Sequence, residues 1–130
     1  MNNTVIHQEI KFNTDAKKIY EALTDSKQFS ELSGGAPAEI HPEAGGSFSL
    51  FGGMISGRNI ELIPNKRIVQ AWRPGNWEEG LYSIVKIEFI EKGSETILMF
   101  DHTAFPEEQR EHLDAGWHAN YWQPLQTYLS

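Results

Sequence analysis

Cysteine is absent from the 130 residues, and acidic residues outnumber basic ones. Without cysteine the chain forms no disulfide, no thiolate nucleophile and no cysteine-ligated zinc site. Eleven Lys and Arg against eighteen Asp and Glu give a net charge of −7, which disfavours nucleic acids and anionic membrane surfaces as partners. No apolar run approaches the roughly 20 residues of a membrane span, and the first residues do not resemble a signal peptide. We therefore expect a cytoplasmic location.

The motifs of common catalytic and metal sites are also missing. The sequence contains no Gly-x-Gly-x-x-Gly loop, Walker loop, Gly-x-Ser-x-Gly turn or His-Glu-x-x-His pair. A helix would place His112 and His118 on different faces, where they do not share a metal ion. We therefore expect no cofactor, no metal site and no familiar catalytic residue.

The first third of the chain predicts one strand and two short helices. With 39% hydrophobic residues the chain can bury one core, and we expect a single domain over residues 1–130. Alternation over residues 5–12 predicts a half-buried strand. Thr14 and Asp25 are the expected N-caps of the two helices, and the pair Gly34-Gly35 is expected to end the second helix.

Glycines and prolines separate short β-rich runs from residue 36 to about residue 103. This pattern predicts an antiparallel meander with strands over about residues 39–41, 47–51, 56–63, 67–73, 82–91 and 95–103. Val85, Ile87 and Phe89 alternate with charged residues. The alternation predicts a sheet that is covered on one face and exposed to water on the other.

The last segment predicts a long amphipathic helix that begins near Pro106. Its large apolar residues recur four apart, at Leu113, Trp117, Tyr121 and Leu125. A stripe with such large rings needs an apolar partner, and the inner face of the meander is the candidate. Pro124 lies inside the segment and has no N–H, so we expect the helix to bend near residues 120–124 or to end soon after.

The order of these elements resembles the helix-grip fold, also called START-like or SRPBCC. Ordered sequence blocks carry a closer resemblance: Ala36-Pro37-Ala38, Gly45-Gly46-Ser47-Phe48, Leu62-Ile63-Pro64-Asn65-Lys66, Ile68-Val69-x-x-Trp72-Arg73, Trp77-x-Glu79-Gly80 and Gly116-Trp117. Over about residues 5–129 the chain resembles the C-terminal-type domain of the activator of heat-shock protein 90 ATPase homologue family. The resemblance implies an α+β fold in which a curved antiparallel sheet of six to seven strands grips the C-terminal helix.

The resemblance implies two kinds of partner. Other members of the superfamily bind lipids, hormones or polyketides, which implies a hydrophobic small molecule between sheet and helix. The co-chaperone that names the family implies a chaperone partner. Its separate N-terminal domain, which the resemblance implies makes a principal chaperone contact, is not expected in this chain. A cyclase-like or hydrolase-like cavity enzyme is a third interpretation.

Strand parity and the helix stripe predict which side chains meet between sheet and helix. They are Phe48, Leu50, Gln70, Trp72, Leu98, Phe100, His102, Trp117, Tyr121 and Leu125. These residues form either a filled core or a ligand cavity. Gln70 and His102 need hydrogen-bond partners if they are buried, and these are either structural groups or a ligand; His102 could also transfer protons. A parity error of one residue would replace His102 with Asp101.

Three further features have alternative interpretations. Trp77, in a loop over residues 74–81, either folds back as a local plug or contacts a partner. Arg58 is expected at the surface, although an inward position would make it an anion anchor. Ile97 and Met99 have the outer parity of their strand, so both a monomer and a homodimer remain open.

Overall fold

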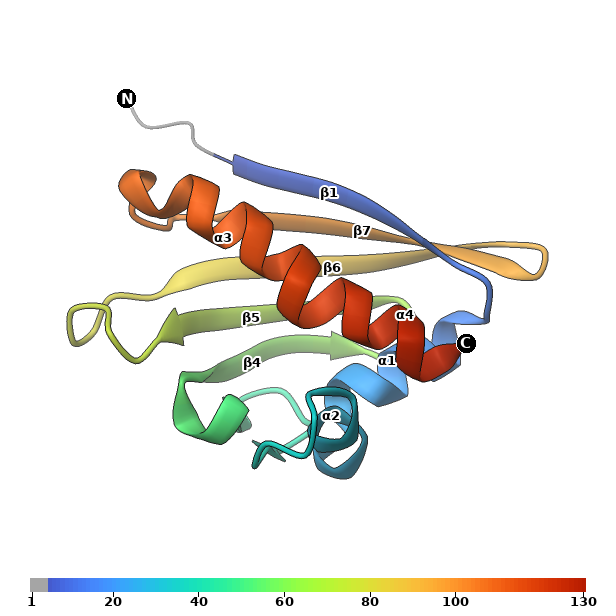
Figure 1. Cartoon of the computed structure of the whole chain (residues 1–130), viewed down its shortest axis with the longest axis horizontal. Helices are drawn as coiled ribbons and strands as arrows, with labels where there is room; N and C mark the ends of the chain where they lie inside the picture. Colours follow the sequence, from blue (N-terminus) through green and yellow to red (C-terminus); the bar gives the residue numbers. More distant parts are fainter. Residues whose placement is uncertain (1–4) are drawn as a thin grey trace.

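The computed structural model describes residues 5–130. Seven strands form one antiparallel sheet in the order β1-β7-β6-β5-β4-β3-β2 (Figure 1). They are β1 (Val5–Phe12), β2 (Glu39–Ile40), β3 (Ser47–Leu50), β4 (Ile55–Ile63), β5 (Arg67–Pro74), β6 (Ser83–Lys92) and β7 (Glu95–Thr103). The predicted meander is confirmed, and β1 extends it beyond β7.

The helical segments follow the predicted order. They are α1 (Ala16–Thr24), α2 (Ser26–Leu32), the 3₁₀ turns η1 (Phe51–Gly53) and η2 (Glu107–Gln109), α3 (Arg110–Trp117), the π-helical segment η3 (His118–Trp122) and α4 (Gln123–Leu129). Asp25 caps α2 as predicted, by accepting a hydrogen bond from Gln28 N–H at 2.9 Å. The prediction of Thr14 as the cap of α1 was wrong. Asp15 holds that position, because its carboxylate is the group that reaches Lys18 N–H, at 3.0 Å.

The segments α3, η3 and α4 form one long helix with an irregularity near its middle. Within η3 the hydrogen bonds reach five residues back, as from Gln123 N–H to His118 O. Pro124 cannot donate to the carbonyl of Asn120, as a regular α-helix would require. The change to π-type hydrogen bonds immediately before the proline lies where a disturbance was predicted. The helix nevertheless continues to Leu129.

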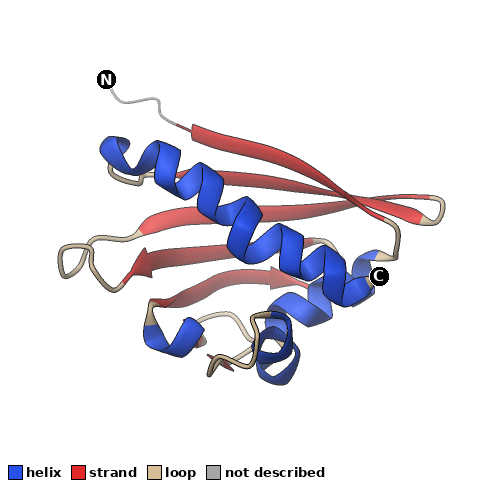
Figure 2. Cartoon of the chain, viewed as in Figure 1, coloured by secondary structure: helices blue, strands red, loops and turns tan. Residues whose placement is uncertain are grey.

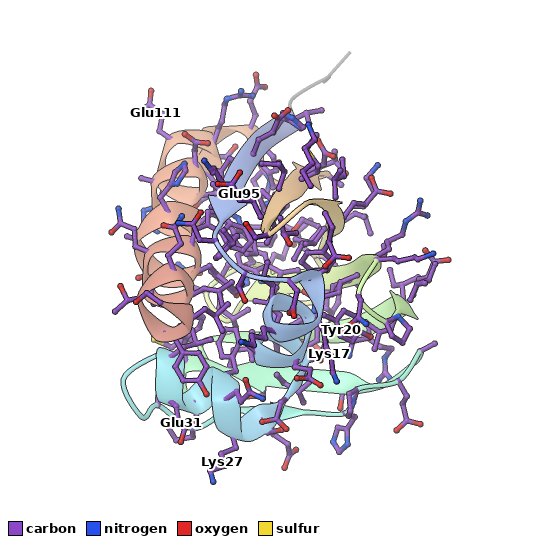
Figure 3. The ribbon with its side chains drawn as sticks, turned by 90° about the vertical axis from the view of Figure 1, so that its right-hand side faces the viewer. Lys17, Tyr20, Lys27, Glu31, Glu95 and Glu111 are labelled. Atoms are coloured by element: carbon purple, nitrogen blue, oxygen red, sulfur yellow. The ribbon has the colours of Figure 1, made fainter. Side chains whose placement is uncertain are left out.

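The long helix crosses one face of the sheet diagonally (Figure 1). At its beginning it lies beside β1, because Gln8 Nε2 donates to the carbonyl of Asp114 at 3.1 Å. Its last segment, α4, packs against α1 and α2. Figure 2 distinguishes the strands from the helices that cover them. Figure 3 shows the long helix as a layer beside the sheet, with the exposed Glu111 near its beginning.

The side chains that face the helix alternate along the strands as predicted. In β7, Thr96, Leu98, Phe100 and His102 are all fully buried. Asp101 has the opposite parity, and its carboxylate pairs with His7 Nδ1 at 2.7 Å on the outer face. The predicted parity is therefore confirmed.

Candidate functional site

The diagonal course of the helix leaves one corner of the inner sheet face uncovered. A pocket of about 530 Å³ opens there between α3, η1, the start of β4 and the end of β5. Its wall contains five aromatic side chains: Phe51, Trp72, Trp77, Trp117 and Tyr121. Four polar side chains also line it, three of them exposed at the mouth: Asn76, His112 and Asn120, with Gln109 half-buried.

The structure divides the ten predicted cavity residues into two groups. Trp72, Trp117 and Tyr121 line the pocket. The others lie in the filled interior, where all but the half-buried Gln70 are buried: Phe48, Leu50, Gln70, Leu98, Phe100, His102 and Leu125. Most of the interface between sheet and helix is therefore a packed core, and one corner is a pocket; that this pocket holds a ligand stays a prediction.

Tyr121 joins the helix to the sheet at the pocket wall. Its hydroxyl accepts a hydrogen bond from Trp72 Nε1–H at 3.2 Å. Its ring centroid lies 4.1 Å from that of Trp117 and 5.4 Å from that of Phe51. Burial raises the pKa of the Tyr121 phenol well above its ordinary value, so the hydroxyl keeps its proton.

His102 lies behind the pocket in a hydrogen-bond chain whose direction is fixed by its end groups. Trp117 Nε1–H can only donate, so His102 Nδ1 accepts, at 3.0 Å. The proton of the neutral ring is therefore on Nε2, which donates to Ser83 Oγ at 2.6 Å. Ser83 in turn donates to the carbonyl of Trp72 at 3.1 Å. This hydrogen-bond chain fixes the positions of two wall residues, Trp72 and Trp117, relative to each other.

The environment of His102 gives no support to proton transfer. Burial lowers the pKa of His102 to about 3, because the charged ring would lose its hydration. Both ring nitrogens are hydrogen-bonded, and His102 is not among the residues that line the pocket. Its partners are the structural groups expected of a buried polar side chain.

Gln70 and Arg58 also have structural partners. Gln70 Nε2 donates to Asn59 Oδ1 at 3.1 Å, and Asn59 Nδ2 donates to the carbonyl of His41 at 3.0 Å. These bonds connect β5 and β4 to the segment before β3. Arg58 is exposed, and its guanidinium donates to the carbonyl of Gly45 at 2.6 Å. The expectation of a surface position for Arg58 is confirmed.

Trp77 folds back onto the protein and is 8% exposed. Its ring packs edge-to-face against Trp72, with centroids 5.9 Å apart. Arg73 holds the loop in place, because its Nη2 donates to the carbonyls of Trp77 and Glu78 at 2.5 and 3.2 Å. The folded-back alternative is the one observed, and a role of Trp77 in contacting a partner stays a prediction.

Several residues of the site were not predicted from the sequence. Phe51 was expected to end a strand, but it begins η1 with a φ of 54° and so turns toward the pocket. Ser83 shares the inner parity of Val85, which was the available signal for its role. Asn120 lies in the π-helical segment, and the helical stripe gave no signal for it.

Over residues 5–130 no three His, Cys, Asp or Glu side chains come together in a way that could hold a metal ion. None of the helices in this range is long and apolar enough to cross a membrane.

A seven-stranded antiparallel sheet that grips a long C-terminal helix, with two short helices after the first strand, defines a helix-grip domain of the SRPBCC class. The family model described as "Activator of Hsp90 ATPase homolog 1-like protein" matches residues 13–130. The chain belongs to this family, as its sequence blocks indicated.

Relatives and solved structures agree with this family. The human "Activator of 90 kDa heat shock protein ATPase homolog 1" is 30% identical over 118 residues, which cover 90% of this chain and 35% of that protein. A Dictyostelium discoideum homologue is 42% identical over 107 residues, which cover 82% of this chain and 27% of that protein. This chain therefore spans about a third of the length of such relatives. The crystal structure of an HSP90 activator from Plasmodium falciparum superposes with a TM-score of 0.91 at 29% identity and covers 98% of this chain and 96% of that one.

Proposed function

We propose that the chain binds a small hydrophobic molecule in the corner pocket. The observation that carries the proposal is the pocket itself, about 530 Å³ with five aromatic wall residues. This volume lies within the range of roughly 300–1,000 Å³ that is typical of small-molecule sites. The wall is apolar and the mouth is polar, which is the usual arrangement of such sites.

The pocket wall is held in place by bonds that do not involve a ligand. Trp72 donates to Tyr121 at 3.2 Å and Trp117 donates to His102 at 3.0 Å. Arg73 ties down the loop that carries Trp77. A ligand that enters a preformed site loses less binding free energy to the ordering of side chains. The hydrogen bonds therefore support a binding role for this corner.

A blocking variant tests the proposal. Gly116 lines the pocket, and a Cβ added there would meet its nearest neighbour, Asn120 Nδ2, at an ordinary 3.7 Å. The substitution Gly116→Leu should therefore fill the pocket without straining the helix. We expect wild type to increase the fluorescence of N-phenyl-1-naphthylamine, and Gly116→Leu to abolish this increase. The matched control is Ala115→Leu, at the exposed neighbouring position. Equal responses of all three proteins would contradict the proposal.

A second candidate function is contact with the 90-kDa heat-shock chaperone. The supporting observation is that the human relative, named an activator of that chaperone's ATPase, aligns with 90% of this chain. Titrating the 130-residue chain into purified chaperone, by calorimetry and by an ATPase assay, tests this candidate. We expect binding with weak or no stimulation of the ATPase. No detectable binding at chaperone concentrations of tens of micromolar would count against it.

A further inference from the structure

We infer that the occupant of the pocket is an uncharged aromatic molecule that carries a hydrogen-bond acceptor, such as an aryl ketone, and that the Tyr121 hydroxyl donates to this acceptor. The inference rests on the proposed binding function and adds to it the chemical class of the ligand. Three properties of the pocket lead to it: the lack of charge in its lining, the direction of its buried hydrogen bonds, and its aromatic wall.

The pocket lining contains no Asp, Glu, Lys or Arg, although the whole chain has a net charge of −7. A charged ligand in the pocket would lose its hydration without gaining a paired charge, which is costly. The imidazole of His112 is exposed at the mouth and remains in contact with water. The lining therefore favours an uncharged molecule.

The hydrogen bonds of the wall determine which buried donor is free for a ligand. Trp72 Nε1–H donates to Tyr121, and Trp117 Nε1–H donates to His102. Tyr121 is 7% exposed and uses its oxygen as an acceptor. Over residues 5–130 its own O–H proton has no hydrogen-bond acceptor. This O–H is therefore complementary to an acceptor such as a carbonyl oxygen.

The shape of the wall favours a ring system. The ring of Trp72 lies 5.1 Å from Trp117 and 5.9 Å from Trp77, and Tyr121 continues the group at 4.1 Å from Trp117. Aromatic rings at such distances prefer offset-stacked or edge-to-face partners. A planar aromatic ligand extends this cluster, and its carbonyl group would meet the Tyr121 hydroxyl.

Three matched probes test the inference: 2-acetylnaphthalene, 2-ethylnaphthalene and 2-naphthoate. Their dissociation constants are measured with wild type, Tyr121→Phe and Tyr128→Phe by quenching of tryptophan fluorescence. Tyr128→Phe is the matched control, because it removes a phenol hydroxyl whose partner is Glu31, outside the pocket lining.

We expect Tyr121→Phe to weaken binding of the ketone by about three- to tenfold, the effect of one hydrogen bond. Binding of the hydrocarbon should stay within about twofold, and Tyr128→Phe should affect neither probe. The carboxylate should bind to wild type at least about tenfold more weakly than the ketone, because its charge is unpaired. Comparing each probe between wild type and variant cancels the different hydrophobicity of the probes.

The outcomes separate the inference from the proposed function. If none of the probes binds wild type, both are overturned. If ketone and hydrocarbon bind but respond equally to Tyr121→Phe, the binding function stands and the donor role of Tyr121 is overturned. Carboxylate binding as tight as that of the ketone overturns the uncharged class.

An infrared measurement avoids dependence on the folding of Tyr121→Phe. With carbonyl-labelled 2-acetylnaphthalene bound to wild type, the carbonyl stretch should shift to lower frequency than in an alkane solvent. An alkane-like frequency contradicts the inference.

Discussion

The two ends of the interface between helix and sheet are built from different kinds of side chain. At the packed end, formed by α1, α4 and the strands they face, the residues are apolar and at most 9% exposed: Ile10, Ile19, Phe89, Leu98 and Leu125. At the pocket end, formed by α3, η3 and the strands they face, the hydrogen-bonded residues are aromatic or polar: Trp72, Ser83, His102, Trp117 and Tyr121. The segments α1 and α4 lie at the first end, and α3 and η3 lie at the second.

The contrast separates stability from the shape of the site. Apolar burial is nondirectional, so the packed end stabilises the fold without fixing an exact arrangement of polar groups. Hydrogen bonds contribute modestly to net stability but are costly when one partner is removed. The hydrogen-bond chain from Trp117 through His102 to Ser83 therefore fixes the geometry of the pocket wall more than it stabilises the fold. Substitutions at the two ends should accordingly have different effects.

The largest expected effect is at the packed end. Leu98→Ala should lower the free energy of unfolding by about 2–5 kcal/mol, because it leaves a cavity in a fully buried cluster. Urea unfolding followed by circular dichroism measures the loss. In the fraction that remains folded, affinity for pocket probes should be unchanged. If Leu98→Ala is fully folded and still binds the probes much more weakly than wild type, the packed end also shapes the pocket, and the distinction between the two ends is wrong.

The next effect is the pH dependence that His102 adds at the pocket end. In the folded state its pKa is about 3, whereas in the unfolded state it is about 6.5. Between these values the unfolded state binds the additional proton, so the free energy of unfolding falls as pH falls. The slope approaches about 1.4 kcal/mol per pH unit from this one group. Unfolding curves at pH 4.5 and 7 measure it.

Two variants isolate the contribution of His102 from that of the carboxylates. His102→Gln can keep both hydrogen bonds but does not titrate, so the acid-dependent loss should be smaller than in wild type. His7→Gln is the comparison on the outer face, where bonds to Glu9 and Asp101 raise the pKa of His7. The stabilisation from His7 is present below about pH 6.5 and is lost as pH rises through its raised pKa. Equal pH slopes in wild type and His102→Gln would show that His102 is not the group responsible.

A smaller effect is expected from removing the Ser83 hydroxyl, which belongs to the hydrogen-bond chain behind the pocket. Ser83→Ala leaves His102 Nε2–H without its acceptor at 2.6 Å, which should cost about 1–2 kcal/mol. Because this hydroxyl also connects to the carbonyl of Trp72, the affinity for pocket probes should decrease as well. Thermal unfolding measures the loss of stability, and probe titration on the same sample measures the loss of affinity. If Ser83→Ala lowers the free energy of unfolding but leaves the affinity for probes unchanged, the hydrogen-bond chain does not position the pocket wall.

The smallest effect is expected at an exposed contact. Tyr128→Phe removes the 2.9 Å hydrogen bond from the Tyr128 hydroxyl to Glu31. Exposed polar contacts of this kind contribute less than about 0.5 kcal/mol. The free energy of unfolding measured in urea should therefore equal that of wild type within experimental error. A loss as large as that of Ser83→Ala would show that exposed and buried polar groups contribute alike.

The sequence predicted the packed end better than the pocket end, for physical reasons. Alternation in β7 and the four-residue spacing of Trp117, Tyr121 and Leu125 record which side chains are buried, and burial was predicted correctly. The pocket depends on where the helix does not cover the sheet. That corner is set by the crossing direction and by the left-handed backbone of Phe51, which a hydrophobic pattern does not encode.

The buried polar groups were predicted in position but not in pairing. His102 and Gln70 were recognised as needing partners, yet their partners come from strands or helices distant in sequence: Ser83, Trp117 and Asn59. Pairing of this kind depends on strand register and on the height of the helix above the sheet. Neither quantity can be obtained from a single sequence.

The π-helical segment also determines how the long helix tolerates a change in length. A π-helical turn is an α-helical turn with one extra residue, so deleting one residue from His118–Trp122 would leave a regular α-helix in which the later residues keep nearly the same faces. Leu125, which is fully buried, would stay on the buried face, and α4 would stay beside α1 and α2. The long helix should therefore tolerate the loss of one residue from His118–Trp122 better than a regular α-helix would.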